Sequence, residues 1–287
     1  MPYFAPPGAK ERHIDTETCP VTVPGATERI VQCEAIGSPF VVSVAVPPGF
    51  DPGEGAPLKV VYTLSANMSF ASAVETARLA AFARELPPLL IVGIGYDRPR
   101  VPYGMDLSMR DFTPTPEQGL YLPGDDPGRK RQAGGAHAFL DFMEGTVKPL
   151  VEREYGADPA DATIRGHSVG GLLGLTALFQ RPGIFQRYVL GSPSIWWDHG
   201  VALSYEAEYA AVNTDLPARV FISAGGLEEE GDSAPAKMIT NVREMARRLE
   251  SRGYPGLRLT SHVFEGETHA SVNPATVSRG LRSVFAE

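Results

Sequence analysis

Gly166-His167-Ser168-Val169-Gly170 (GHSVG) matches the pattern GxSxG, and the residues around this stretch make the match specific. A short run typical of a strand, Ala162–Arg165, precedes it, and a helical pattern, Leu172–Phe179, follows it. A serine on a tight strand-to-helix turn is held in a strained backbone conformation. Glycines two residues to either side let the strand and the helix approach without Cβ clashes. The stretch therefore predicts a nucleophilic serine, Ser168, on a strand-to-helix elbow.

Strand and helix patterns alternate on both sides of this elbow. Two runs rich in Val and Ile between residues 28 and 47 flank Gly37, Ser38 and Pro39, which predicts an antiparallel hairpin. Further strands are expected at Leu58–Leu64, Leu89–Ile94, Ala162–Arg165, Tyr188–Leu190, Arg219–Ser223 and Leu259–Phe264. Helices are expected at Phe70–Glu85, Ala136–Tyr155, Leu172–Phe179, Pro235–Ser251 and Asn273–Phe285. This order predicts an α/β fold with a mostly parallel central sheet, an N-terminal antiparallel hairpin and helices on both faces.

Composition limits the function classes. The 287 residues are 43% hydrophobic and carry no linker or repeat, which predicts one domain over residues 1–287. The net charge of −8 argues against nucleic acid or an anionic membrane as a partner. Cys19 and Cys33 lack the spacing of a metal site and indicate two free thiols. Met1–Gly8 lacks the basic start and apolar run of a secretory signal, so we expect a cytoplasmic protein.

Residues 97–135 interrupt the alternation with prolines, glycines and charged residues. Irregular stretches of this length inside a compact domain are usually functional loops. We therefore expect residues 97–135 to form a loop insertion that covers the substrate. The cations of this region could form either a rim for an anionic substrate or a solvated face: Arg98, Arg100, Arg129, Lys130 and Arg131.

A serine hydroxyl needs a base to remove its proton, and His269 is the best-placed histidine. It lies in a turn, Glu265–Ala270, directly after the last predicted strand, where the carboxyl edge of the sheet would present it to Ser168. The other histidines fall in an N-terminal arm, a helix, the elbow itself, a loop and a strand: His13, His137, His167, His199 and His262.

The third member of such a triad is a carboxylate between the serine and the histidine in chain order. The strand ending at Ser223 leads into Ala224, two glycines, Leu227 and three consecutive glutamates. A carboxylate here would accept the proton on the far nitrogen of His269 and fix its tautomer. Glu228 is our first choice, with Glu230 and Asp232 as alternatives.

At this point the chain resembles a known family of α/β-hydrolases, described as putative esterases, which includes bacterial ferric enterobactin and salmochelin esterases. Esterase D, feruloyl esterases and mycolyltransferases are more distant relatives. The resemblance spans about residues 28–285 and rests on RDFTP (110–114), GHSVGG (166–171), SPSIWW (192–197), SAGGLEE (223–229) and GETHASVNPATVSRGLR (266–282). It implies an α/β-hydrolase fold and ester cleavage without a cofactor or metal. It carries over Ser168, Glu228 and His269 as the triad and Arg110 as a substrate contact.

The resemblance has one departure, which concerns the oxyanion hole. Relatives usually have an Asp-Gly pair after the strand that ends here at Leu64, whereas this chain has Ser65, Ala66 and Asn67. The match assigns the second oxyanion donor to the Asn67 N–H, beside the Val169 N–H. Trp197, next to Trp196, is expected either to stack on an aryl group of the substrate or simply to pack.

These residues predict a serine carboxylic ester hydrolase that works through an acyl-enzyme on a small-molecule ester of siderophore or aryl type. One alternative is an acyltransferase that uses the same triad with an alcohol acceptor. A second is a non-catalytic binding protein on the same fold. The sequence leaves the oligomeric state open.

Overall fold

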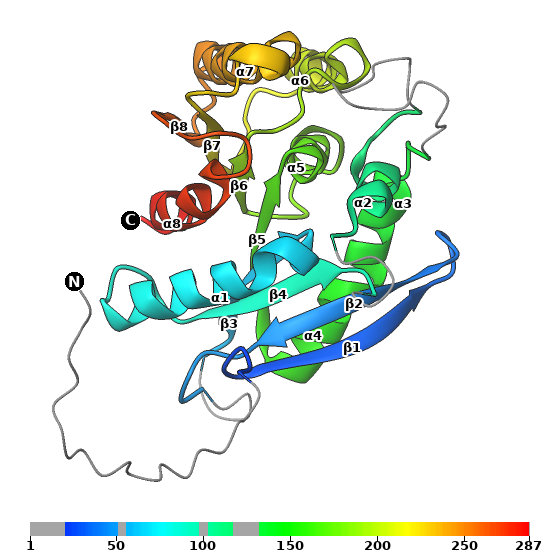
Figure 1. Ribbon diagram of the computed structural model, residues 1–287, viewed down its shortest axis with the longest axis vertical. Coiled ribbons are helices and arrows are strands. Elements are labelled where there is room, and N and C mark those ends of the chain that lie inside the picture. Colours follow the sequence, from blue (N-terminus) through cyan, green and yellow to red (C-terminus); the bar gives the residue numbers. More distant parts are fainter. Residues whose placement is uncertain (1–20, 51–55, 98–102, 117–131, 287) are drawn as a thin grey trace, which may run out of the picture.

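The computed structural model describes residues 21–50, 56–97, 103–116 and 132–286 and contains one eight-stranded sheet (Figure 1). The strand order is β1-β2-β4-β3-β5-β6-β7-β8. β1 and β2 form an antiparallel hairpin, β2 is antiparallel to β4, and every later pairing is parallel. The bounds are β1 Ala26–Cys33, β2 Ser38–Ala45, β3 Leu58–Leu64, β4 Leu89–Gly95, β5 Ala157–His167, β6 Arg187–Gly191, β7 Arg219–Gly225 and β8 Arg258–Phe264. The predicted α/β class and hairpin are confirmed.

Helices cover both faces of the sheet. α1 Ala66–Phe82 and α8 Val272–Phe285 pack together on one face, over Val61, Val189 and Phe221. The opposite face carries α3 Ala136–Phe142, the π-helical turn Met143–Val147, α4 Lys148–Tyr155, α5 Val169–Gln180, α6 Val201–Val212 and α7 Met238–Arg252. Neighbouring strand residues alternate between the two cores, as in Tyr188, Val189 and Leu190, because successive side chains of a strand point to opposite faces.

Two helices have no counterpart among those expected from the sequence. α2, Met105–Phe112, lies inside residues 97–135, so the expectation of irregular backbone throughout that stretch was wrong for these residues. α6 was missed because its buried positions are Ala202, Glu206 and Tyr209, which do not form an apolar stripe. The expected helix 136–155 is interrupted by the π-helical turn, and α1 begins four residues earlier than Phe70.

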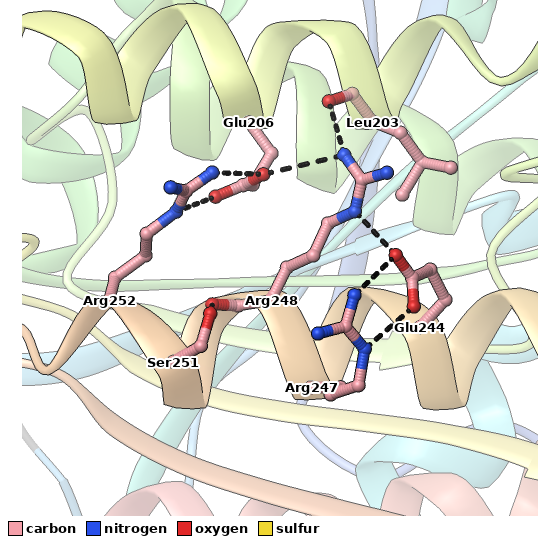
Figure 2. Close-up of polar contacts among 7 residues, drawn as sticks. All are labelled: Leu203, Glu206, Glu244, Arg247, Arg248, Ser251 and Arg252. Atoms are coloured by element: carbon pink, nitrogen blue, oxygen red, sulfur yellow. Dashed lines mark hydrogen bonds and ion pairs between the residues drawn. The ribbon is translucent and has the colours of Figure 1, made fainter.

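α6 and α7 are joined by a network of ion pairs (Figure 2). The buried Glu206 carboxylate of α6 accepts two hydrogen bonds from Arg252, at 2.8 and 3.2 Å, and lies 3.7 Å from Arg248. Glu244 holds Arg248 and Arg247 on the more exposed side. α6 and α7 follow the loops after β6 and β7. The ion pairs between these helices therefore help to hold both loops in place at the carboxyl edge of the sheet.

Cys33 is buried and forms no disulfide, whereas Cys19 lies outside the described residues. Within the described ranges, no helix combines the length and the apolar composition needed to cross a membrane.

Candidate active site

Each of three parallel strands is followed directly by a serine with an unusual backbone conformation. Ser65 follows β3 with a φ of 52°, Ser168 follows β5 with 58°, and Ser192 follows β6 with 41°. Positive φ is uncommon for residues other than glycine and costs about 1–3 kcal/mol, so such residues cluster where function requires a strained geometry. Their common position at the carboxyl edge of the sheet marks this edge as the candidate site.

Ser168 sits on the predicted elbow, between the end of β5 and the first residue of α5. Its N–H donates to the Gly191 carbonyl at 2.9 Å, and its carbonyl accepts from Leu172 in α5 at 3.0 Å. A Cβ on Gly166 would collide with the Gly170 carbonyl, which explains the first glycine of the pattern. The second glycine, Gly170, is not required in the same way, because a Cβ there would lie 3.5 Å from the Leu64 Cβ, an ordinary contact. The expected steric need is therefore confirmed for Gly166 and not for Gly170.

The Ser168 hydroxyl lies beside a second hydroxyl. Its Oγ is 3.3 Å from Ser194 Oγ, and the Ser194 N–H donates to the Ser168 carbonyl at 3.1 Å. Ser194 is buried and belongs to the segment that follows β6. No role for Ser194 could be predicted from the sequence, because its contact with Ser168 depends on the pairing of β5 with β6. The available signal was a serine directly after each of three neighbouring parallel strands.

Glu228 and His269 are hydrogen-bonded, with 2.9 Å between Glu228 Oε2 and His269 Nδ1. The glutamate side chain is 0% exposed and the histidine side chain 44% exposed, so one partner is fixed in the interior and the other reaches the surface. The other carboxylate oxygen accepts from the Ser192 hydroxyl at 2.5 Å and from the Gly225 N–H at 2.6 Å. The pair is thus anchored by the ends of β6 and β7.

Two opposing effects set the charge of Glu228. Burial alone would raise the pKa of its carboxyl, but hydrogen bonds from His269, Ser192 and the Gly225 N–H outweigh burial and hold the pKa below its ordinary value. Glu228 is therefore an anion at neutral pH. A buried carboxylate on Nδ1 leaves His269 Nε2 as the nitrogen able to accept a proton.

The three consecutive glutamates have different surroundings. Glu229 accepts hydrogen bonds from the N–H and hydroxyl of Thr240 near the start of α7. Glu230 is exposed. The side chain of Asp232, the other alternative acid, lies outside the described residues. Among the described acids of this loop, Glu228 is the one that contacts His269.

His167 lies against His269, with ring centroids 4.6 Å apart. Neither of its ring nitrogens has a hydrogen-bond partner within the described part of the chain. Burial, together with the nearby His269 and Arg165, lowers the pKa of His167 well below its ordinary value of 6.5. His167 is therefore neutral at pH 7 and adds an uncharged ring beside His269.

The two residues assigned to the oxyanion hole start helices. Val169 is the first residue of α5, and Asn67 is the second residue of α1, after Ser65. The Asn67 side chain forms two hydrogen bonds with the main chain of Tyr96, at 2.8 and 3.0 Å, which ties the start of α1 to the end of β4. Main-chain N–H groups in the first turn of a helix point toward an approaching anion.

Arg110 and Trp197 have partners within the protein. The Arg110 guanidinium forms a bidentate pair with the buried Asp111, at 2.6 and 2.9 Å, and Tyr96 donates to the same carboxylate. Trp197 is 2% exposed and its indole N–H donates to Thr115, so it offers a substrate very little surface. Trp196 is half-buried and is the better candidate for an aryl contact. The predicted cationic rim, Arg98, Arg100, Arg129, Lys130 and Arg131, lies outside the described residues.

Comparisons with known proteins agree with this fold. A family model described as "Putative esterase" matches residues 33–272. The chain is 35% identical over 267 residues to ferri-bacillibactin esterase BesA of Bacillus subtilis (strain 168), covering 91% of this chain and 90% of that protein. It is 31% identical over 294 residues to siderophore triacetylfusarinine C esterase of Aspergillus fumigatus, covering 93% and 96%. The crystal structure of BES protein from Bacillus cereus superposes with a TM-score of 0.82 at 27% identity, covering 95% and 100%.

The family match extends from the end of β1 to the start of α8 and includes the elbow, Glu228 and His269. The protein belongs to this esterase family and is a carboxylic ester hydrolase.

Proposed function

We propose that the protein cleaves siderophore-type esters through an acyl-enzyme formed on Ser168, with His269 as general base and Glu228 as its orienting carboxylate. The observation that carries this proposal is the 2.9 Å hydrogen bond between Glu228 and His269 at the sheet edge that bears the strained Ser168. A serine, a histidine and a buried carboxylate in this chain order are the parts of a nucleophilic triad.

The chemistry follows from these positions. His269 Nε2 accepts the Ser168 proton as Oγ attacks the ester carbonyl, and the same proton then passes to the leaving alcohol. The ionised Glu228 stabilises the imidazolium formed in each step. The main-chain N–H groups of Val169 and Asn67 are assigned to the carbonyl oxygen as it gains negative charge. Water, activated by His269, then releases the acid and restores Ser168.

The Ser168 hydroxyl contacts the Ser194 hydroxyl in this structure. We assign the hydrogen bond between Ser168 and His269 to the substrate-bound state. Catalytic hydrogen bonds are often long or unformed before substrate binds. His269 is well placed for a short movement because its side chain is partly exposed while its partner Glu228 is fixed.

The substrate class is inferred from the relatives. The names of the bacterial and fungal relatives describe esterases of siderophores, and they match about nine-tenths of this chain. Trp196 supplies a half-buried aromatic surface beside the segment that follows β6, which suits a bulky or aryl ester. Arg110 is assigned to the binding of an anionic group on that ester.

The proposal is tested by incubating the protein with siderophore esters, with and without bound iron, and with p-nitrophenyl butyrate, followed by separation of the products. We expect hydrolysis of a siderophore ester at a higher kcat/KM than the butyrate, and no turnover by Ser168→Ala. Cleavage of the butyrate alone would overturn the substrate class. An ester product formed with added glycerol in place of the free acid would indicate acyl transfer, and inactivity on all substrates would overturn the function.

A further inference from the structure

The segment Ser192–Ser194, which we call the SPS turn, contacts both ends of the proposed triad. The Ser192 hydroxyl donates to Glu228 Oε1 at 2.5 Å. Two residues later, the Ser194 hydroxyl lies 3.3 Å from the Ser168 hydroxyl. Glu228 and Ser168 are 60 residues apart in the chain, yet one short turn after β6 contacts both.

The SPS turn is held by main-chain hydrogen bonds and by close packing against α5. The Ser192 N–H donates to the Ser223 carbonyl of β7 at 2.7 Å, and the Ser194 N–H donates to the Ser168 carbonyl at 3.1 Å. A Cβ on Gly171 would lie 2.8 Å from Pro193 Cα, so the turn packs against the first turn of α5 at the minimum separation. Both hydroxyls therefore have positions set by the backbone and the packing around them.

Ser192 adopts a costly conformation to make its contact. Its φ of 41° is in the left-handed region, where glycine would be the unstrained choice. A glycine there would lack the hydroxyl that donates to Glu228. The strained backbone of Ser192 thus accompanies a hydrogen bond to the proposed triad, as expected of a functional rather than a packing residue.

Ser194 contacts the reacting atom itself. A hydroxyl is one donor and two acceptors, so Ser194 can donate to Ser168 Oγ while retaining its own proton. At 3.3 Å the contact is longer than an ordinary O–H···O bond, which is usual for catalytic contacts before the substrate is bound. Donation becomes stronger as Ser168 Oγ gains negative charge, because hydrogen bonds to charged acceptors are the stronger ones.

We propose that Ser194 is a further catalytic residue, whose hydroxyl donates to Ser168 Oγ as His269 removes the Ser168 proton, and that Ser192 is a positioning residue for Glu228. The inference rests on the proposed function. The proton balance is simple: the Ser168 proton moves to His269 Nε2, and the Ser194 proton stays on Ser194. Ser168 Oγ thus has a hydrogen-bond donor at the moment it becomes charged.

The test compares Ser194→Ala with Ser43→Ala, which also removes a buried hydroxyl that donates a hydrogen bond, but in β2, far from the elbow. A hydrogen bond to a charged group is worth about 1.5–3 kcal/mol, so kcat for p-nitrophenyl butyrate should fall about 10- to 100-fold in Ser194→Ala. KM should change little. The rate constant of inactivation by a fluorophosphonate should fall by the same factor, because that reaction begins with the same attack.

Two further variants keep the test decisive. Ser194→Thr retains the hydroxyl and should recover most of the rate. Ser194→Cys retains the volume but donates weakly, so it should behave like alanine even if alanine lowers the melting temperature. For Ser192→Ala, the proton resonance of the His269–Glu228 hydrogen bond should shift or broaden in the NMR spectrum, whereas Ser43→Ala should leave it unchanged.

The outcomes separate this inference from the function on which it depends. If wild type reacts with the probe at Ser168 and Ser194→Ala reacts equally fast with an unchanged kcat, Ser194 has no catalytic role and the inference alone is wrong. If wild type does not react at all, the proposed function is wrong and the inference fails with it. A fall in kcat in Ser43→Ala equal to that in Ser194→Ala would show a general loss of stability and would also overturn the inference.

Discussion

Glu228 Oε2 lies 2.9 Å from His269 Nδ1, although the two residues are 41 positions apart in the chain. The contact joins the loop after β7 to the loop after β8, two neighbouring parallel strands that end at the same edge of the sheet. The carboxylate is buried and holds its charge through three hydrogen bonds, while the imidazole reaches the surface. This arrangement makes separate predictions for the acid, the ring beside it and the surrounding supports.

The first prediction concerns the acid. Glu228→Gln should lower kcat about a thousandfold or more, because an amide cannot hold the required His269 tautomer or stabilise the imidazolium. Steady-state kinetics with p-nitrophenyl butyrate provides the measurement. Glu230→Gln is the matched control, since Glu230 is exposed and two residues away, and it should retain full activity. Near wild-type activity in Glu228→Gln would remove this residue from the triad.

The second prediction concerns His167 and pH. The pKa of this histidine is lowered in the folded protein, so the unfolded chain binds the proton more readily below its ordinary pKa of 6.5. The free energy of unfolding should therefore fall as the pH drops below 6.5. The slope from this group should correspond to the uptake of up to about one proton on unfolding. Urea unfolding of His167→Gln between pH 5 and 7 should lack that component. His262→Gln should change the slope less, because its side chain is only partly buried. An unchanged slope in His167→Gln would contradict the account.

The third prediction concerns substrate binding by Arg110. Arg110→Ala should raise KM for an anionic aryl ester about tenfold, with little effect on short p-nitrophenyl esters. Because Arg110 also pairs with the buried Asp111, the double variant Arg110→Ala/Asp111→Asn is needed to avoid an unpaired buried carboxylate. If both substrates lose activity equally in the double variant, Arg110 supports the fold rather than the substrate.

The fourth prediction concerns the ion pairs between α6 and α7 (Figure 2). Arg252→Met should lower the melting temperature by several degrees, because it leaves the buried Glu206 with Arg248 alone at 3.7 Å. Arg247→Met, five positions earlier in the same helix, breaks a more exposed pair and should have almost no effect. Equal melting temperatures for the two variants would show that the ion pair of the buried Glu206 is no more stabilising than the exposed pair.

The sequence predicted the parts of this molecule that depend on neighbouring residues. β3 was predicted over the same residues, Leu58–Leu64, because its apolar run is bounded by polar and turn residues. The elbow at Ser168 was predicted from a local pattern, whose first glycine, Gly166, meets a local steric requirement. α6 could not be predicted, since its buried face includes Glu206, whose charge is balanced by arginines from another helix. A partner remote in the chain leaves no periodic pattern.

The same distinction holds within the site. Glu228, Glu229 and Glu230 are equivalent as sequence, and only the fold separates a buried carboxylate from one that contacts α7 and one that faces solvent. The contacts of Ser192 and Ser194 also depend on how β5, β6 and β7 are paired, because the SPS turn meets residues from the ends of both neighbouring strands. The sequence pattern identified the segment 192–197 as part of the family resemblance, but it did not predict the contacts of that segment.

The most direct test of the central claim is labelling with a fluorophosphonate probe, which reacts only with an activated serine. Mass spectrometry of the labelled wild-type protein should locate the adduct on Ser168. Ser168→Ala should take up no label, and His269→Ala should react far more slowly because its serine lacks a base. No labelling of the wild type, or equal labelling of Ser168→Ala, would contradict the assignment of Ser168 as the nucleophile.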